Sequence, residues 1–332
     1  MPIPATPPVF DNDQGKPVAV PPKPMLWGHT YVSITGQNGE GEEIPLTGFS
    51  GREWPAVFMQ PGAVGLDSPP FELHSDESPN LDGGNFRGAR TASREIMIPV
   101  YLHAIDRRTL RDLKRKLIGS LNPRNGYCLL KMMEGDGQPR YLRVYYKGGM
   151  EGQETEDSAG FRWIKYGLQF TAFEPWFFGD RLPVAEWSFG GGTPFLPAAQ
   201  AFVPLRINKG AVAGSSIPVV NPGDVEAWPV WEIHGPVRSF RLTGPDGKQV
   251  FAIPAPAGGA DAVPADRTLT IDTRPGYKSL RDDLGANYWP KLAPSPALWS
   301  VPPGRSLVGV ELVAGSGPAT LKLTLNPRYG SY

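Results

Sequence analysis

The sequence predicts a mainly β protein of two domains, and three observations lead to this fold class. The chain has 332 residues, which is the length of about two domains. It contains 40 glycines and 38 prolines, about twice their usual share, and both residues disfavour helices. Hydrophobic residues make up 40% of the chain and include 9 tryptophans, enough to build cores. Short strands joined by many tight turns are therefore expected, and an all-helical bundle is excluded.

The N-terminal part begins with a proline-rich arm. Residues 1–24 hold eight prolines, a composition typical of an extended arm that is either disordered or lies on a neighbouring molecule. The alternation of apolar residues begins near Trp27 and opens a domain that we expect to span residues 25–185. Within it, residues 60–92 are rich in Pro and Gly and are expected to be mostly loop.

Apolar alternation predicts the strands of this first domain. In REIMIPVYL (94–102) every second residue is apolar, and Pro99 on the opposite face indicates an edge strand or a bulge. The segments YCLLKMM and YLRVYY flank a GDGQP turn and predict a hairpin. The longest alternation, at 162–173, predicts a strand with one buried face. We therefore expect a β-barrel or sandwich-like domain.

One helix is predicted, at residues 106–119. Tyr101 to Ile118 is the longest window without Gly or Pro. Leucines recur within and just beyond it at spacings of three and four, at positions Leu110, Leu113, Leu117 and Leu121. Asp106 suits the N-cap, and Gly119 with the Asn122-Pro123 pair indicates the C-terminal end.

The C-terminal domain is expected at residues 216–332, after a linker at 186–215 rich in Gly, Pro and Ala. Alternation recurs around Phe240, Leu269, Val310 and Leu323, with turn residues between the segments. Several short strands at such spacing predict a β-sandwich or barrel.

Charge and cysteine content exclude several classes. Lys and Arg balance Asp and Glu at 33 each, which argues against a dedicated nucleic-acid binder. With charged residues at only 20%, the surface is expected to be buried largely against partners. The single cysteine, Cys128, lies in an apolar run and predicts a buried strand thiol. We see no signal peptide and no apolar run of membrane-spanning length, so we expect a soluble protein made in a cytoplasm, with no membrane partner.

No motif predicts catalysis. The sequence has no G-x-S-x-G elbow and no phosphate-binding P-loop, and its four histidines form no metal-ligand pair. We therefore expect no catalytic, cofactor-binding or metal-binding residues, and no cofactor.

Two groups of residues are candidates for partner contacts. The helix carries Arg107, Arg108, Arg111 and Arg115, which predict either a phosphate-contacting face or a solvated or subunit-contacting one; the neutral chain favours the latter. In the second domain, Tyr288, Trp289 and Trp299 are candidates for stacking on sugar rings or contacting a partner. Packing in a core is the alternative.

The order of these elements resembles the distal tail proteins of long-tailed, siphophage-type bacteriophages. The resemblance lies in LDGGNFRGAR followed by REIMIPVYL and one Leu-striped helix, then in a long strand that closes with FTAFEPWFFGD. It continues in VVNPGDVEAWPVWEIHGPV, LTIDTRPG, PPGRSLVGVEL and a final Leu-alternating strand with NPRY. It covers residues 27–332, and the arm 1–24 and the long linker depart from it.

The resemblance implies a virion structural protein at the tail tip, assembled in the host cytoplasm. The first domain would build a homohexameric hub ring, and the second would be a galectin-like jelly-roll sandwich. Partners would be further copies of the chain, the tail tube protein, and the tape-measure and tail-tip or receptor-binding proteins, with DNA passing through the ring without specific binding. Two other hypotheses stay open, a carbohydrate-binding or lectin-like module that recognises host glycans, and a glycoside hydrolase with an accessory domain.

Overall fold

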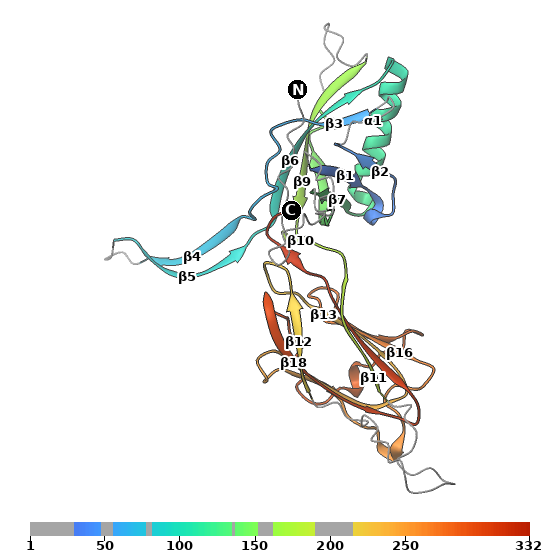
Figure 1. The fold of residues 1–332 in the computed structure, drawn as a ribbon. Helices are drawn as coiled ribbons and strands as arrows, with labels where there is room; N and C mark the ends of the chain where they lie inside the picture. The colour runs from blue at the N-terminus through green and yellow to red at the C-terminus, as the bar shows by residue number, and fades with distance from the viewer. Residues whose placement is uncertain (1–29, 48–55, 78–81, 135–136, 152–161, 190–214) are drawn as a thin grey trace, which may run out of the picture. The chain divides into compact units, whose positions relative to one another are not determined.

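The computed structural model describes residues 30–47, 56–77, 82–134, 137–151, 162–189 and 215–332. The chain divides into two compact units, one of residues 1–175 with Tyr332 and one of residues 176–331 (Figure 1). Strands dominate both, so the predicted mainly β class is confirmed. The predicted arm at 1–24 lies outside the described residues.

The first unit is built on an antiparallel β-barrel. Its strands are hydrogen-bonded in the order β2-β1-β7-β8-β9-β6-β3. Their bounds are β1 Tyr31–Thr35, β2 Glu43–Pro45, β3 Ala56–Met59, β6 Arg94–His103, β7 Cys128–Met133, β8 Pro139–Gly148 and β9 Trp163–Ala172. The two ends of this series meet, because the Met59 amide donates a 2.8 Å hydrogen bond to the carbonyl of Leu46, the residue after β2. The barrel is therefore nearly closed.

Strand alternation fills the barrel interior as predicted. Along β9 every second side chain is buried, and Leu168 and Phe170 are fully inaccessible to solvent. Strand β6 pairs with β9 over its full length and alternates in the same way. The predicted hairpin is also confirmed, since β7 pairs antiparallel with β8.

Pro99 does not mark an edge strand, because β6 lies between β9 and β3. The Pro99 carbonyl accepts a 2.8 Å hydrogen bond from the Gln60 amide, on the side of β3. Since the nitrogen and carbonyl of a strand residue face the same side, the missing N–H of Pro99 also faces β3. Strand β3 ends at Met59, opposite Val100, so Pro99 lies just beyond the ladder between β3 and β6.

The one α-helix among the described residues, α1, spans Arg107–Leu121 and packs beside the barrel (Figure 1). Asp106 is its N-cap, as predicted, and accepts a 2.7 Å hydrogen bond from the Thr109 amide. The helix continues through Gly119 for two residues beyond the predicted end. This extension buries Leu121 completely, a gain that outweighs the weak helix propensity of one glycine.

The prediction that residues 60–92 are mostly loop is wrong. Strands β4 (Phe71–Glu77) and β5 (Gly84–Thr91) form an antiparallel two-stranded hairpin in this region. The expectation rested on the Gly and Pro content of the segment. Almost all residues of the hairpin are exposed.

The second unit is a sandwich of two antiparallel sheets, as predicted. One sheet has the order β11-β19-β13-β16-β17, and the other the order β12-β18-β14-β15. The first comprises β11 Leu182–Phe189, β19 Ala319–Leu325, β13 Pro229–His234, β16 Thr268–Asp272 and β17 Ser279–Asp282. The second comprises β12 Ser215–Asn221, β18 Gly304–Ala314, β14 Val237–Thr243 and β15 Val250–Ile253. One buried apolar cluster around Trp231 fills the space between them.

Short elements complete the two units. Strands β10 (Phe177–Phe178) and β20 (Arg328–Tyr329) pair within the second unit. The 3-10 helices are η1 Gln37–Gly39, η2 Pro123–Asn125, η3 Ala257–Gly259 and η4 Trp289–Lys291. None of the helices in the described ranges combines the length and apolar character needed to cross a membrane.

The predicted domain limits need correction. We expected the first domain to end at residue 185 and a linker to span 186–215. The first unit instead ends at Pro175, and β11 pairs residue by residue with β19 of the sandwich. The second boundary also moves, because Ser215 already belongs to β12. Residues 190–214 lie outside the described residues.

Candidate assembly interface

The β4–β5 hairpin presents an apolar face that no described residue of its own unit covers. Phe71 and Leu73 lie on one face of β4, and the pairing register places Phe86 and Ala89 on the same face of β5. The exposed fractions of Phe71, Leu73 and Phe86 are 58%, 71% and 68%. Large apolar side chains that are exposed together on one surface are typical of a site that contacts another molecule.

The opposite face of the hairpin is charged and internally paired. The Arg90 Nε lies 2.6 Å from a Glu72 carboxylate oxygen, and Arg87 pairs with Asp76 across the same strands. A β-bulge at Arg87 shifts the register between His74 and Ser75. The hairpin is thus amphipathic, with a face suited to water and a face suited to another protein.

The hairpin gains little support from the barrel. Its base is closed by a 2.9 Å hydrogen bond from the Ala92 amide to the Pro70 carbonyl, and Figure 1 shows the two strands extending away from the barrel. A two-stranded hairpin alone is marginally stable in water. Contact with another molecule would supply the apolar burial that this one lacks.

Helix α1 carries a second exposed surface, and it is cationic. Arg107, Arg108, Arg111 and Arg115, which we singled out in the sequence, are all exposed. Arg111 lies 3.8 Å from Asp112, and Lys116 is 2.5 Å from Glu42. Ile118 follows Arg111 and Arg115 at helical spacing and is 55% exposed, so an apolar side chain joins the arginines on the outer face.

Two of the three candidate aromatic residues are not available for stacking on a sugar. Tyr288 and Trp299 are each only 3% exposed and belong to the sandwich core. The Trp299 ring meets that of Trp231 edge-on, with centroids 5.9 Å apart. Only Trp289 of the three reaches the surface, at 36% exposure. The predicted aromatic platform is therefore wrong for Tyr288 and Trp299.

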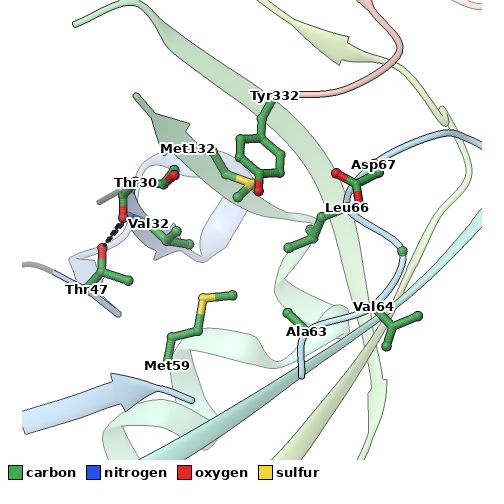
Figure 2. Close-up of a pocket in the computed structure, with 11 residues that line it drawn as sticks. Thr30, Val32, Thr47, Met59, Ala63, Val64, Leu66, Asp67, Met132 and Tyr332 are labelled. Atoms are coloured by element: carbon green, nitrogen blue, oxygen red, sulfur yellow. Dashed lines mark hydrogen bonds between the residues drawn. The ribbon is translucent and has the colours of Figure 1, made fainter. Parts of the chain in front are cut away.

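A hollow of about 420 Å³ opens at one end of the barrel (Figure 2). Figure 2 shows Met59, Met132 and Leu66 on its walls and the ring of Tyr332 over it. Burial and the carboxyl groups of Asp67 and Glu134 raise the pKa of the Tyr332 phenol. The lining brings together no nucleophile, general base and orienting group, so it offers no arrangement for catalysis.

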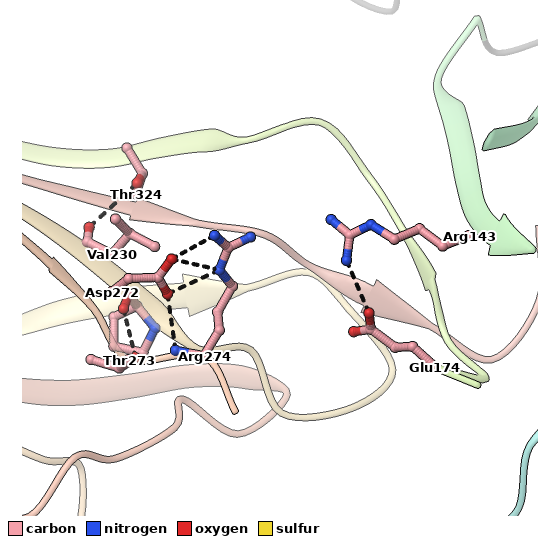
Figure 3. A network of polar contacts seen from close by, with 8 residues as sticks. Arg143, Glu174, Val230, Asp272, Thr273, Arg274 and Thr324 are labelled. Carbon is pink, nitrogen blue, oxygen red and sulfur yellow. Dashed lines mark hydrogen bonds and ion pairs between the residues drawn. The ribbon is translucent and has the colours of Figure 1, made fainter. Parts of the chain in front are cut away.

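Polar side chains near the sandwich core have structural roles. The Asp272 carboxylate accepts hydrogen bonds from Nε and Nη2 of Arg274, at 2.9 and 2.5 Å (Figure 3). The Thr273 hydroxyl donates a 2.6 Å hydrogen bond to the Pro229 carbonyl. Asn221 is buried and its amide donates to the Val225 and Val301 carbonyls. The Asn-Pro-Gly-Asp and Ile-Asp-Thr segments thus tie loops to strands. In the first unit, Figure 3 also shows Arg143 paired with Glu174 at 3.1 Å.

No group of side chains that could hold a metal ion emerges in the described part of the chain. No three His, Cys, Asp or Glu side chains cluster there in a way that would bind a metal. Cys128 is buried on β7 as predicted, and burial raises the pKa of its thiol to about 11. A thiol of that kind stays protonated at neutral pH and is a poor nucleophile.

Comparisons with known proteins find one family model that matches part of the chain. Residues 60–157 match the family described as a phage tail protein RIFT-related domain, a range that includes the hairpin, β6 and α1. No curated protein matches the chain in sequence.

Among solved structures, the chain is similar to the Dit protein of phage SPP1, described as a paradigm of the hub adsorption apparatus in phages that infect Gram-positive bacteria. The TM-score is 0.58 at 13% identity, and the match covers 90% of this chain and 98% of that one. The chain is also similar to a chain of the phage P2 baseplate in its activated conformation with Ca. That TM-score is 0.50 at 11% identity, with 89% and 98% of the two chains covered.

The hairpin was missed in the sequence although two local signals were present. FELHSDE begins with two apolar–polar alternations, NFRGART contains the apolar residues Phe86 and Ala89, and an Asp-Gly-Gly segment lies between the two. Residues 60–157 match the model of the phage tail protein RIFT-related domain, and the chain as a whole shares its fold with the Dit protein of phage SPP1.

Proposed function

We propose that this protein is a structural subunit of the hub at the distal end of a long-tailed phage tail. Six copies form a ring through their first units, and the ring joins the tail tube to the tail-tip and receptor-binding proteins. The protein acts by assembly and catalyses no reaction. The observation that carries this proposal is the unsupported hairpin with its exposed apolar face.

The energetics favour assembly over a free monomer. Burying one large apolar side chain contributes about 1.5–3 kcal/mol, and Phe71, Leu73 and Phe86 all lie on the same face. These contributions offset part of the entropy lost when one subunit joins another. A ring also repeats the same contact at every subunit, so each copy gains it twice.

The charge of the chain suits a channel for DNA. Lys and Arg balance Asp and Glu at 33 each. A strongly basic lumen would hold DNA through release of counterions, whereas a neutral protein lets it pass. The tape-measure protein and the genome would therefore cross the hub without a specific binding site.

Native mass spectrometry and negative-stain microscopy of the full chain test the proposal. We expect hexamers in the spectra and rings in the images at high micromolar concentration. The combined variant Phe71→Ser, Leu73→Ser and Phe86→Ser should be monomeric. The matched control Glu72→Ala with Arg90→Ala, on the charged face, should still assemble. A wild-type protein that stays monomeric at every concentration overturns the proposal.

A further inference from the structure

We propose that the hollow at the end of the barrel is the seat of the Met-Leu-Trp run at 25–27 of the same copy. This run lies shortly before the described residues begin, and its three side chains are large and apolar. The inference stands apart from the proposed hub function, because it concerns a contact within one subunit. It follows from the lining of the hollow, from the place where β1 begins and from the chemistry of the run.

The hollow is the open end of the barrel core. Val32 of β1 and Met132 of β7 line it and are each only 2% exposed, and Leu66, also on the lining, is buried. Met59, the last residue of β3, adds to this apolar wall (Figure 2). The volume of about 420 Å³ lies in the range of pockets that hold a bound group, roughly 300–1,000 Å³. Apolar side chains that fill the hollow would therefore extend the core and leave water.

The chain that precedes β1 arrives at this hollow. Thr30 lines it and is the first described residue. The Thr30 carbonyl accepts a 2.9 Å hydrogen bond from the Thr47 hydroxyl (Figure 2), and that hydroxyl oxygen accepts a 2.6 Å hydrogen bond from the Val32 amide. Three residues span at most roughly 11 Å, so Trp27 is within reach of the hollow in its own copy. Gly28 lies between Trp27 and Thr30 and would let the chain bend inward at little cost.

The lining suits an indole ring. Met59 and Met132 are unbranched and adaptable, and a methionine sulfur makes favourable contacts with aromatic rings at about 5 Å. A buried indole N–H needs an acceptor, and the lining includes Asp67, whose carboxylate can accept it. The ring of Tyr332 over the hollow adds an aromatic surface (Figure 2). Trp27 would thus find apolar walls, sulfur contacts and an acceptor in the same space.

The run at 25–27 fits the hollow better than the other run of three apolar residues in the proline-rich part, at 18–20. That run is Val-Ala-Val, whose side chains are smaller and carry no aromatic ring. Seating it would also leave the larger side chains at 25–27 in water beside the barrel, which the hydrophobic effect disfavours. With 25–27 in the hollow, the arm at 1–24 would start from a fixed point on each subunit.

Photo-cross-linking tests the contact directly. In the variant Trp27→p-benzoylphenylalanine, the excited ketone inserts into nearby C–H bonds and favours those of methionine. After irradiation of dilute protein, we expect linked peptides that join position 27 to Met59 or Met132 in the monomer band of a denaturing gel. The matched control Phe10→p-benzoylphenylalanine carries the same group further along the arm and should label these methionines far less.

Thermal unfolding supplies an independent test. Trp27→Ala should lower the melting temperature of the first unit by about 3–12 °C, the shift expected when one large apolar side chain loses its burial in a unit of this size. Phe10→Ala and deletion of residues 1–24 should each change it by less than about 1 °C. Met59→Ala should lower it less in the Trp27→Ala background than in wild type, because two side chains in contact lose their interaction only once. Circular dichroism checks that each variant is folded.

The outcomes separate this inference from the proposed function. Links to Met59 or Met132 that occur only in a dimer band, or no links at all, overturn the seat within one copy. A Trp27→Ala variant that melts at the wild-type temperature overturns it as well. Each of these results leaves the hub ring intact, whereas a chain that never forms rings overturns the hub and leaves the seat of residues 25–27 in place.

Discussion

Replacement of Phe170 by alanine measures how much of the barrel's stability comes from its interior. Phe170 is fully buried on β9, lies opposite Ile96 of β6 and meets the ring of Tyr146 edge-on at 5.8 Å between centroids. Truncating a buried Phe costs about 3–5 kcal/mol through lost transfer energy and the cavity left behind. Because the ring contact with Tyr146 is also lost, we expect Phe170→Ala to lower the free energy of unfolding by about 4 kcal/mol, the middle of that range.

Calorimetry on monomeric protein at low concentration measures this cost. For a unit of this size, 1 kcal/mol shifts the melting temperature by about 2–4 °C, so Phe170→Ala should lower the transition of the first unit by about 8–16 °C. The matched control is Gln169→Ala, because Gln169 is the exposed neighbour on the same strand and should change stability by less than about 0.5 kcal/mol. Equal losses for the two variants would refute the assignment of β9's faces.

Three further predictions test other features. Maleimide should label Cys128 only after denaturation, since the thiol is buried with a pKa of about 11; rapid labelling of folded protein contradicts this. The Thr109 amide lowers the folded-state pKa of Asp106, so its cap is strong above the unfolded value of about 3.9 and is lost as pH falls through the folded pKa. Asp106→Asn caps at every pH, so melting curves from pH 7 to pH 2 should show the variant gaining on wild type upon acidification; a constant difference contradicts the cap. Trp299→Ala should cost about 3–5 kcal/mol in urea unfolding and Trp289→Ala far less, and similar costs would contradict their burial.

The elements with one buried face were predictable from the sequence. The alternation in β9 and β6 and the leucine stripe of α1 directly record which side chains enter the core. Such patterns arise because each strand or helix must bury one face, so the periodicity survives in the residue order. The sandwich strands followed for the same reason.

The domain boundary could not be placed in this way. Strand β11 lies at the edge of its sheet, and half of its residues are exposed, with no strict alternation along the whole strand. The glycine-rich run at 190–194 follows β11 directly, and its composition is typical of a linker. Strand β11 belongs to the second unit because it pairs with β19. The local sequence gives no sign of that pairing.

The buried aromatics of the second unit show a different limit. Tyr288 and Trp299 lie in a segment rich in Pro and Ala without strand periodicity, which suggests a surface loop. Trp299 instead packs so closely over Gly244 that a Cβ at that glycine would lie 2.9 Å from the indole Cγ. A loop can thus close one end of a sandwich core without showing any periodic pattern.

The β4–β5 hairpin differs from these elements because its apolar side chains are exposed. All seven residues of β4 are exposed and hold the extended conformation. Because a pair of strands without support is marginal in water, its exposed apolar side chains are suited to a contact outside the monomer. Phe71 and Leu73 alternate with Glu72 and His74 as residues of a core strand do, and under the proposed function this apolar face would be buried in the assembled ring. A strand that alternates apolar and polar residues but stays exposed in the monomer is therefore a candidate for a contact between proteins.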